Sequence, residues 1–204
     1  SDGGKVYLIL GDTTSDTPNL DGIMSDYGLK KVSGYIADTQ RCYQGNYYAI
    51  FPQLSLSGDL GSGISNQMVL LLNSPGIEKT DTDNDNLTVT PFMQTSDSGY
   101  AVTENDQTQG QYILGAVSTN AISADSSDSD SEDEDDKSDA TDTDTKTARL
   151  TVLTSASMIS SDITDQLTTL DNLTLFVNSV TENFDNVNNV AIEAKSLSTE
   201  TNTP

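Results

Sequence analysis

The sequence of residues 148–184 is ARLTVLTSASMISSDITDQLTTLDNLTLFVNSVTENF. Leu150, Val152 and Leu153 lie in a run typical of a β-strand, and Ser155 to Ser161 is a turn of small residues. The apolar residues that follow recur at steps of three or four, which predicts one amphipathic helix: Ile163, Leu167, Leu170, Leu173, Val177, Val180 and Phe184. A strand, a turn and a helix in this order favour a layered α/β domain over a β-sandwich.

The residues before this stretch predict more strands and one short helix. Leu20, Ile23, Met24 and Tyr27 have helical spacing, and Gly28 is placed to end that helix in a left-handed conformation. The predicted strands are Lys5–Leu10, which we expect to be covered on both faces, Val32–Asp38, Gln67–Leu72, Leu87–Gln94, Gln111–Ser118 and Val190–Ala194. We therefore predict an α/β fold with a mostly parallel or mixed sheet and flanking helices, of flavodoxin-like or class I glutamine amidotransferase-like layout.

An acidic tract divides the chain. The hydrophobic fraction is 34%, low against about 45–50% in globular domains, a count that includes glycine. Eleven acidic residues and one base, Lys137, lie between Asp125 and Asp144. Burial cannot offset the ordering entropy of such a segment. We expect residues 1–122 to form the first part of the domain, 123–147 a disordered acidic insertion, 148–195 the closing strand–helix unit, and 196–204 a polar tail.

The charge and the apolar runs exclude several classes of protein. A net charge of −23 disfavours nucleic-acid binding, because phosphates would be repelled. No run approaches the ~20 apolar residues of a membrane-spanning helix, and no signal peptide opens the chain. The start at Ser1-Asp2-Gly3-Gly4 followed directly by a strand looks like a cut inside a longer protein, so we expect a truncated domain.

The chain offers few groups for catalysis or metal binding. It contains no histidine, which removes Ser-His-Asp and Cys-His arrangements, and Cys42 is its only cysteine. We interpret Cys42 as a partly buried small residue, although Arg41 is adjacent. The sequence therefore predicts no catalytic residue, no cofactor and no metal site.

Other short motifs favour structural roles. Asp81, Asp83 and Asp85 alternate as in a calcium loop, but Asn86 replaces the turn glycine and Phe92 the bidentate glutamate, so a solvated loop is expected. The glycines of Gly58–Gly63 lack dinucleotide-binding spacing and indicate a turn. Two triplets match the N-glycosylation pattern, which is common by chance in a chain rich in Asn and Thr, and Asn172 is better explained as a helix cap. The aromatic residues of one extended segment are expected to pack against a neighbouring layer, with a binding face as the alternative: Tyr43, Tyr47, Tyr48 and Phe51.

The order of segments resembles the extracytoplasmic domain of gliding-motility (GldG-like) auxiliary subunits of ABC transporters. Members of that family carry a Gly-Gly-Lys strand, a Pro-Asn-Leu helix ending in Tyr-Gly, a Thr/Ser pair near Tyr-Ala, a last strand and a Leu-Phe-Leu-Asn-Ala-Val helix. The matching segments here are Gly3–Leu10, Pro18–Leu29, Val32–Asp38, Thr95–Ala101, Tyr112–Val117, Arg149–Ser155 and Asn172–Val180. Thr154, Ala156 and Glu182 depart from the family's Gly, Asp and Trp, which argues against a polar site at that strand end.

The resemblance implies a non-enzymatic extracytoplasmic domain of a membrane-anchored auxiliary subunit, acting by binding the permease or an exported substrate. Its partners would be the permease and, indirectly, the ATPase, with the membrane reached through segments outside this chain. One alternative is a small-molecule-binding or hydrolase-like α/β domain with a pocket near Ser155–Ser161, at the carboxyl ends of the strands. A surface adhesion module, kept soluble by its acidic tract, is another.

Overall fold

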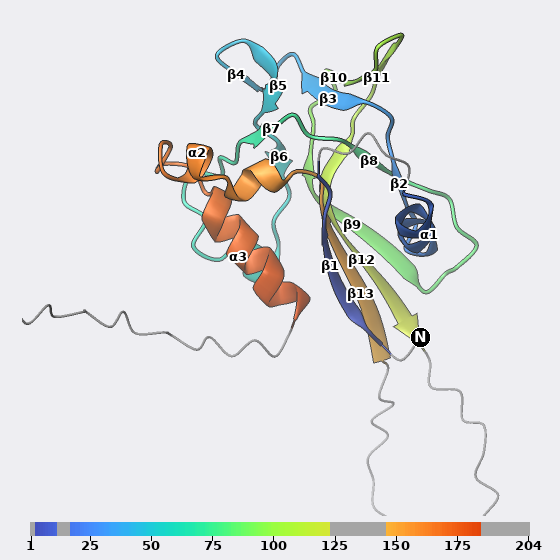
Figure 1. The fold of residues 1–204 in the computed structure, drawn as a ribbon. Coiled ribbons are helices and arrows are strands. Elements are labelled where there is room, and N and C mark those ends of the chain that lie inside the picture. The colour runs from blue at the N-terminus through green and yellow to red at the C-terminus, as the bar shows by residue number, and fades with distance from the viewer. Residues whose placement is uncertain (1–2, 12–16, 123–145, 185–204) are drawn as a thin grey trace, which may run out of the picture.

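The computed structural model describes residues 3–11, 17–122 and 146–184 (Figure 1). The helices are α1 (Pro18–Asp26), α2 (Ser161–Thr164) and α3 (Asn172–Asn183), with short 3₁₀ turns η1 (Gly58–Gly61) and η2 (Ala156–Ile159). The strands are β1 (Lys5–Ile9), β2 (Leu29–Lys31), β3 (Tyr35–Asp38), β4 (Cys42–Tyr43), β5 (Asn46–Ile50), β6 (Gln53–Leu54), β7 (Leu71–Leu72), β8 (Ile77–Lys79), β9 (Leu87–Gln94), β10 (Gly99–Val102), β11 (Gln107–Gln109), β12 (Ile113–Ile122) and β13 (Lys146–Leu153). The fold is α/β, rich in strands and with few helices.

A mixed sheet of seven strands forms the centre of the described part of the chain. Its order is β1-β13-β12-β8-β2, with β9 paired to β12 and β6 paired to β9. β1 and β13 run parallel in continuous register, from Lys5 opposite Arg149 to Ile9 opposite Leu153. β12 pairs antiparallel with β13 along one edge and with β9 along the other. A mostly parallel or mixed sheet was predicted; the sheet is mixed, and among its described strands only β1 and β13 pair in parallel.

Helices α1 and α3 lie on opposite faces of the central sheet. Leu150 and Val152 of β13 belong to the apolar cluster that contains Met24 of α1. Thr151 and Leu153 project from the other face, where Leu153 joins the cluster that contains Leu175 of α3. Successive side chains of a strand point to opposite faces. Alternate residues of β13 therefore face α1 and α3. Figure 1 shows α1 and α3 on either side of the strands.

Two small sheets extend beyond the carboxyl end of β1. β11, β10 and β3 form one, and β4, β5 and β7 form the other. In Figure 1 both lie at the same end of the central sheet, away from the N-terminus. Gln44 and Gly45, between β4 and β5, both have positive φ, which is the conformation of a tight hairpin turn.

The structure corrects the predicted helix over 163–184. The helix is divided into α2 and α3, and residues 165–171 between them are not helical. Asp171, immediately before α3, accepts hydrogen bonds from the backbone N–H groups of Ser65, Asn66 and Met68. Buried backbone N–H groups need hydrogen-bond partners. Asp171 provides them for this loop from outside a helix, and α3 begins at the next residue, Asn172.

The burial of α3 also differs from the apolar pattern. Leu173 and Val177, predicted to face the core, are 57% and 48% exposed. The buried residues of α3 are Asn172, Leu175, Ser179 and Asn183. The helix therefore packs against the sheet largely through polar side chains, which hydrophobic periodicity cannot detect.

Other predicted elements are confirmed in part. α1 ends just before Gly28, and Gly28 has the left-handed conformation that was expected there. Ile23, one of the apolar residues that predicted this helix, is exposed. The strand predicted over Val32–Asp38 is reduced to β3, and that over Gln67–Leu72 to β7. β1 is covered on both faces only in part: Tyr7 and Ile9 pack against one apolar cluster and Leu8 against the other, but Val6 is 45% exposed. β13 begins at Lys146, two residues earlier than expected, while residues 123–145 and the predicted strand Val190–Ala194 lie outside the described residues.

Candidate functional site

A cavity of about 310 Å³ lies at the carboxyl ends of β1 and β13. Gly11 follows β1, and Thr154 to Ser157 follow β13; the opposite wall comes from the segment after β7. The lining residues are Gly11, Leu72, Asn73, Pro75, Thr154, Ser155, Ala156 and Ser157. This is the strand end at which α/β sheets place ligands, and it is the place where the sequence located the alternative pocket.

Hydroxyl groups at this cavity connect the strand ends to one another. Thr154, fully buried, donates to the carbonyl of Leu114 at 2.8 Å, and its Oγ1 lies 2.7 Å from Ser74 Oγ. Ser155 donates to the carbonyl of Leu72, while Ser157 Oγ accepts from the Leu72 N–H. These bonds hold η2 against β7. The sequence predicted the turn but not this role of its hydroxyls.

The side chains that line the cavity offer only neutral hydrogen-bonding groups. No acidic or basic side chain is among its lining residues. A serine nucleophile needs a neighbouring base for activation, and the hydroxyls of Ser155 and Ser157 contact each other at 2.7 Å. The arrangement therefore suits recognition of a neutral polar group.

A second polar cluster, missed by the sequence analysis, surrounds the buried carboxylate of Asp38 at the end of β3. Asp38 accepts from the N–H groups of Gln40, Arg41 and Ser96 and from the Ser96 hydroxyl, at 2.7–2.9 Å. Burial raises the pKa of Asp38, but these hydrogen bonds outweigh it, so the pKa lies below its ordinary value. The carboxylate ties the turn after β3 to the Thr95–Gly99 turn, which is a structural role.

A third cluster lies between α3 and the sheet. Tyr7 of β1 contacts Ser179 Oγ at 2.6 Å, and burial raises the pKa of the Tyr7 phenol to about 12 in spite of that hydrogen bond. Thr151 donates to Asn183. Arg149 pairs with Glu182 at 2.8 Å. Three atoms of this cluster are buried without a hydrogen-bond partner in the described structure: Arg149 Nε, Glu182 Oε2 and Asn183 Nδ2.

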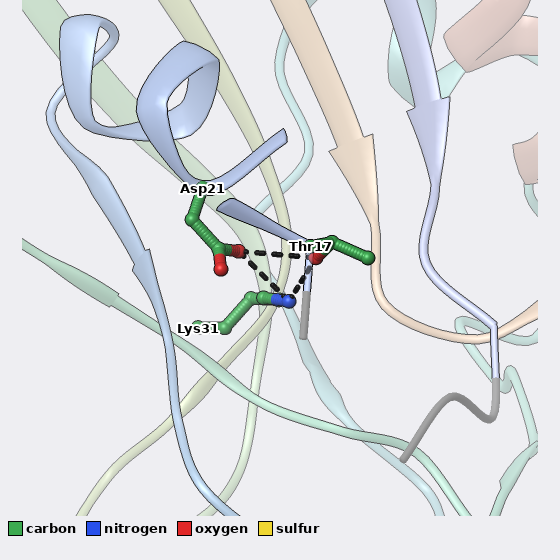
Figure 2. A network of polar contacts seen from close by, with 3 residues as sticks. All are labelled: Thr17, Asp21 and Lys31. Atoms are coloured by element: carbon green, nitrogen blue, oxygen red, sulfur yellow. Dashed lines mark hydrogen bonds and ion pairs between the residues drawn. The ribbon is translucent and has the colours of Figure 1, made fainter. Parts of the chain in front are cut away.

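At the opposite face, Figure 2 shows how the start of α1 is attached to β2. Lys31 Nζ donates to Thr17 Oγ1 at 2.5 Å and forms an ion pair with Asp21 at 2.8 Å. Thr17 is the residue that precedes α1, and Asp21 belongs to its first turn. The pair is partly exposed, so its contribution to stability is small, and its effect is to orient α1.

The residues considered at the sequence level have largely structural environments. Cys42 is partly buried, as predicted, and the Arg41 guanidinium donates to the carbonyls of Phe51 and Pro52. Within residues 3–11, 17–122 and 146–184, no group of three His, Cys, Asp or Glu side chains could hold a metal ion. Asp81, Asp83 and Asp85 lie in an exposed loop.

Asn172 is not the cap of α3; Asp171 holds that position. The Asn172 side chain is buried and bonds to the N–H and carbonyl of Leu70 and to the carbonyl of Met158. Of the aromatic residues, Tyr43 and Phe51 contact each other edge to face with ring centroids 6.0 Å apart, and both pack, as expected, against a neighbouring apolar cluster that contains Leu70 and Ile163. Tyr47 and Tyr48 are exposed instead.

Comparisons with known proteins identify a structural likeness. No family model matches the chain, and no curated protein matches it. Among solved structures it is similar to one described as the mmIFT52 N-terminal domain, with a TM-score of 0.51 and 12% sequence identity. The match covers 89% of this chain and 65% of that one, so this chain spans just under two thirds of its neighbour's length. At this identity the likeness concerns the fold alone.

Within the described residues, no helix is both long enough and apolar enough to span a bilayer.

Proposed function

We propose that this chain is the extracytoplasmic domain of a membrane-anchored auxiliary subunit of an ABC transporter, and that it acts without catalysis by binding the permease or an exported substrate. The support is the order of the segments that resemble the GldG-like family. In the structure these segments form β1, α1, β3, β10, β12, β13 and α3, in chain order. Each matched segment therefore contains at least part of a helix or strand, although Thr95–Ala101 is divided between the Thr95–Gly99 turn and the start of β10.

The chemistry of the polar clusters supports binding over catalysis. The hydroxyls at the cavity and the carboxylate of Asp38 are engaged in hydrogen bonds that hold turns together. A serine or threonine nucleophile would need a neighbouring base, and no acidic or basic side chain lines the cavity. The one observation that carries the proposal is this use of Thr154, Ser155 and Ser157 as connectors, at the strand end where an α/β enzyme would place its reacting groups.

The test is purification of the full-length protein through an affinity tag from detergent-solubilised membranes of its own organism. We expect the permease and the ATPase of one transporter to be recovered with it, in amounts comparable to the bait. A tagged, unrelated membrane protein of similar abundance is the control. Recovery of the protein from the soluble fraction, with neither subunit, would overturn the proposal.

A flavodoxin-like domain that binds a small molecule is the second candidate, and the cavity favours it. The cavity lies at the carboxyl ends of the parallel pair β1–β13, and its lining of hydroxyl, amide and apolar groups suits a neutral ligand. Thermal denaturation in the presence of a panel of neutral polyols and amides tests it. A stabilising compound should lose its effect when Ala156→Phe fills the cavity, and absence of any stabilisation across the panel counts against this candidate.

A further inference from the structure

The hydroxyl groups that line the cavity donate their protons to the protein itself. Thr154 Oγ1 donates to the carbonyl of Leu114, and Ser155 Oγ donates to the carbonyl of Leu72. The hydroxyl oxygens of Ser155 and Ser157 lie 2.7 Å apart. A hydroxyl has one proton to donate, and that of Ser155 goes to Leu72, so the proton in this contact comes from Ser157. None of the three hydroxyls therefore keeps a donor for a ligand.

Asn73 is the lining residue whose side chain remains available. It is exposed, and within the described residues its side-chain amide makes no hydrogen bond. Its backbone N–H donates to the carbonyl of Tyr48 at 3.0 Å, which holds the chain at this point. Its φ of 45° lies in the left-handed region, which asparagine enters more readily than most residues other than glycine. Asn73 thus offers an amide donor and a carbonyl acceptor from a backbone that is held in place.

The other described residues that line the cavity bring no polar side chain: Gly11, Leu72, Pro75 and Ala156. A polar ligand group buried against them without a hydrogen-bond partner costs free energy. A polyol would bring several hydroxyls to a cavity in which one side chain is available to bond them. A ligand with one compact polar group and an apolar body avoids this cost. The volume of about 310 Å³ is at the lower end of the roughly 300–1,000 Å³ of ligand pockets, so the ligand is small.

We propose that the cavity binds the carboxamide group of a small ligand with an apolar body, and that Asn73 is its specificity-determining residue. This inference rests on the second candidate function, the binding of a small molecule. A primary carboxamide carries an N–H donor and a carbonyl acceptor side by side, so it can pair with the Asn73 amide through two hydrogen bonds. A carboxylate lacks the donor and is repelled by a chain of charge −23. A cation finds no acidic side chain among the lining residues.

Titration of the isotope-labelled chain with matched sets of compounds, followed by NMR chemical shifts, tests the class of ligand. Acetamide, butyramide and benzamide are each compared with the carboxylate and the alcohol of the same carbon skeleton. We expect at least one amide to shift the backbone signals of Gly11, Ser155 and Ser157. It should bind at least about fivefold more tightly than its matched carboxylate and alcohol, because those leave one group of Asn73 unpaired. Amides that bind no more tightly than the matched alcohols would overturn the inference.

Asn73→Gly tests the role of the side chain, because glycine keeps the left-handed backbone without strain. It should weaken binding of the amide about tenfold. Gln44→Gly is the matched control: Gln44 is also exposed and has a φ of 50°, but it lies between β4 and β5 and does not line the cavity. The control should bind the amide as tightly as the wild type, and thermal denaturation checks that both glycine variants remain folded. Asn73→Asp should bind the amide less tightly and the matched amine more tightly than the wild type, because a carboxylate accepts hydrogen bonds but donates none.

These measurements distinguish failure of this inference from failure of the function on which it rests. If an amide binds the wild type and Asn73→Gly equally well, Asn73 does not recognise it and only this inference fails. If binding of the amide survives Ala156→Phe, the ligand lies outside the cavity and the inference is wrong about the site. If no compound of the three sets binds the wild type, the second candidate function fails and this inference fails with it.

Discussion

Replacing Asn172 with alanine should cause the largest loss of stability among the polar substitutions in α3. The side chain is 1% exposed and makes three hydrogen bonds, at 2.9–3.1 Å, with the Leu70 N–H, the Leu70 carbonyl and the Met158 carbonyl. Leu70 and Met158 are themselves buried. Alanine would leave these backbone groups without a partner and out of reach of water.

The magnitude follows from these three bonds. Each buried polar group left unsatisfied costs about 1–3 kcal/mol, and partial relaxation of the loop reduces the sum. We expect a loss of about 3–5 kcal/mol in the free energy of unfolding, a large part of the roughly 5–15 kcal/mol of a typical domain. At about 2–4 °C per kcal/mol for a chain of this size, the melting temperature should fall by roughly 6–20 °C.

Urea denaturation followed by circular dichroism measures the change, with Asn178→Ala as the matched control. Asn178 also donates two hydrogen bonds to carbonyls, of Leu60 and Ser62, but it is partly exposed and water can replace it. We expect the control to lose about 0.5–1.5 kcal/mol. The reasoning is refuted if Asn172→Ala loses no more than Asn178→Ala.

Three other measurements test the remaining polar and backbone features. Gly34→Ala should destabilise the protein by at least about 2 kcal/mol more than Gly45→Ala, as measured by urea denaturation. Both glycines have positive φ, but only at Gly34 would an added Cβ collide with the Val102 carbonyl. Equal losses of stability in the two variants would contradict this. The raised pKa of Tyr7, about 12, means that its stabilising effect is complete below pH 10 and is lost as pH rises through 12. Unfolding midpoints from pH 9 to 11.5 should therefore fall less steeply for Tyr7→Phe than for the wild type, and parallel curves would disprove the assignment. The pKa of Asp38 is lowered in the folded state, so its carboxylate stabilises the protein fully above about pH 4, and this stability is lost as pH falls through the folded-state pKa. Asp38→Asn should therefore be less stable than the wild type at pH 7 and should lose less further stability on acidification. An acid-unfolding profile identical to that of the wild type would contradict this assignment.

Strands and the first helix were predictable because their signals are local. β9 has the predicted boundaries, and α1 lies between Pro18 and Gly28 as its spacing and its end residue indicate. The apolar run of β1 indicates a strand because it is short and directly follows Gly3 and Gly4. The location of the cavity after β13 was also anticipated, since the turn of small residues follows a strand end.

The partners of the polar side chains were not predictable. Asp38 meets Ser96 from 58 positions away, and Asn172 meets Leu70 from 102 positions away. Neither residue lies in a motif whose spacing indicates a long-range bond. The sequence left a mostly parallel and a mixed sheet open for a similar reason, because strand direction depends on how the strands are connected and not on the composition of each strand; the structure has a mixed sheet.

The sequence by itself determined where apolar segments lie, that the charge is concentrated in one tract, and that histidine chemistry is absent. The tertiary structure decided how residues 148–184 are used. The apolar spacing from Ile163 to Phe184 predicts one helix, but backbone groups of the loop near Met68 require partners, and Asp171 and Asn172 supply them. That requirement divides the helix, and α3 then packs through Asn172, Leu175, Ser179 and Asn183 while Leu173 and Val177 stay exposed. Periodicity records which residues are apolar, whereas the need to satisfy buried polar groups depends on contacts that exist only in the folded chain.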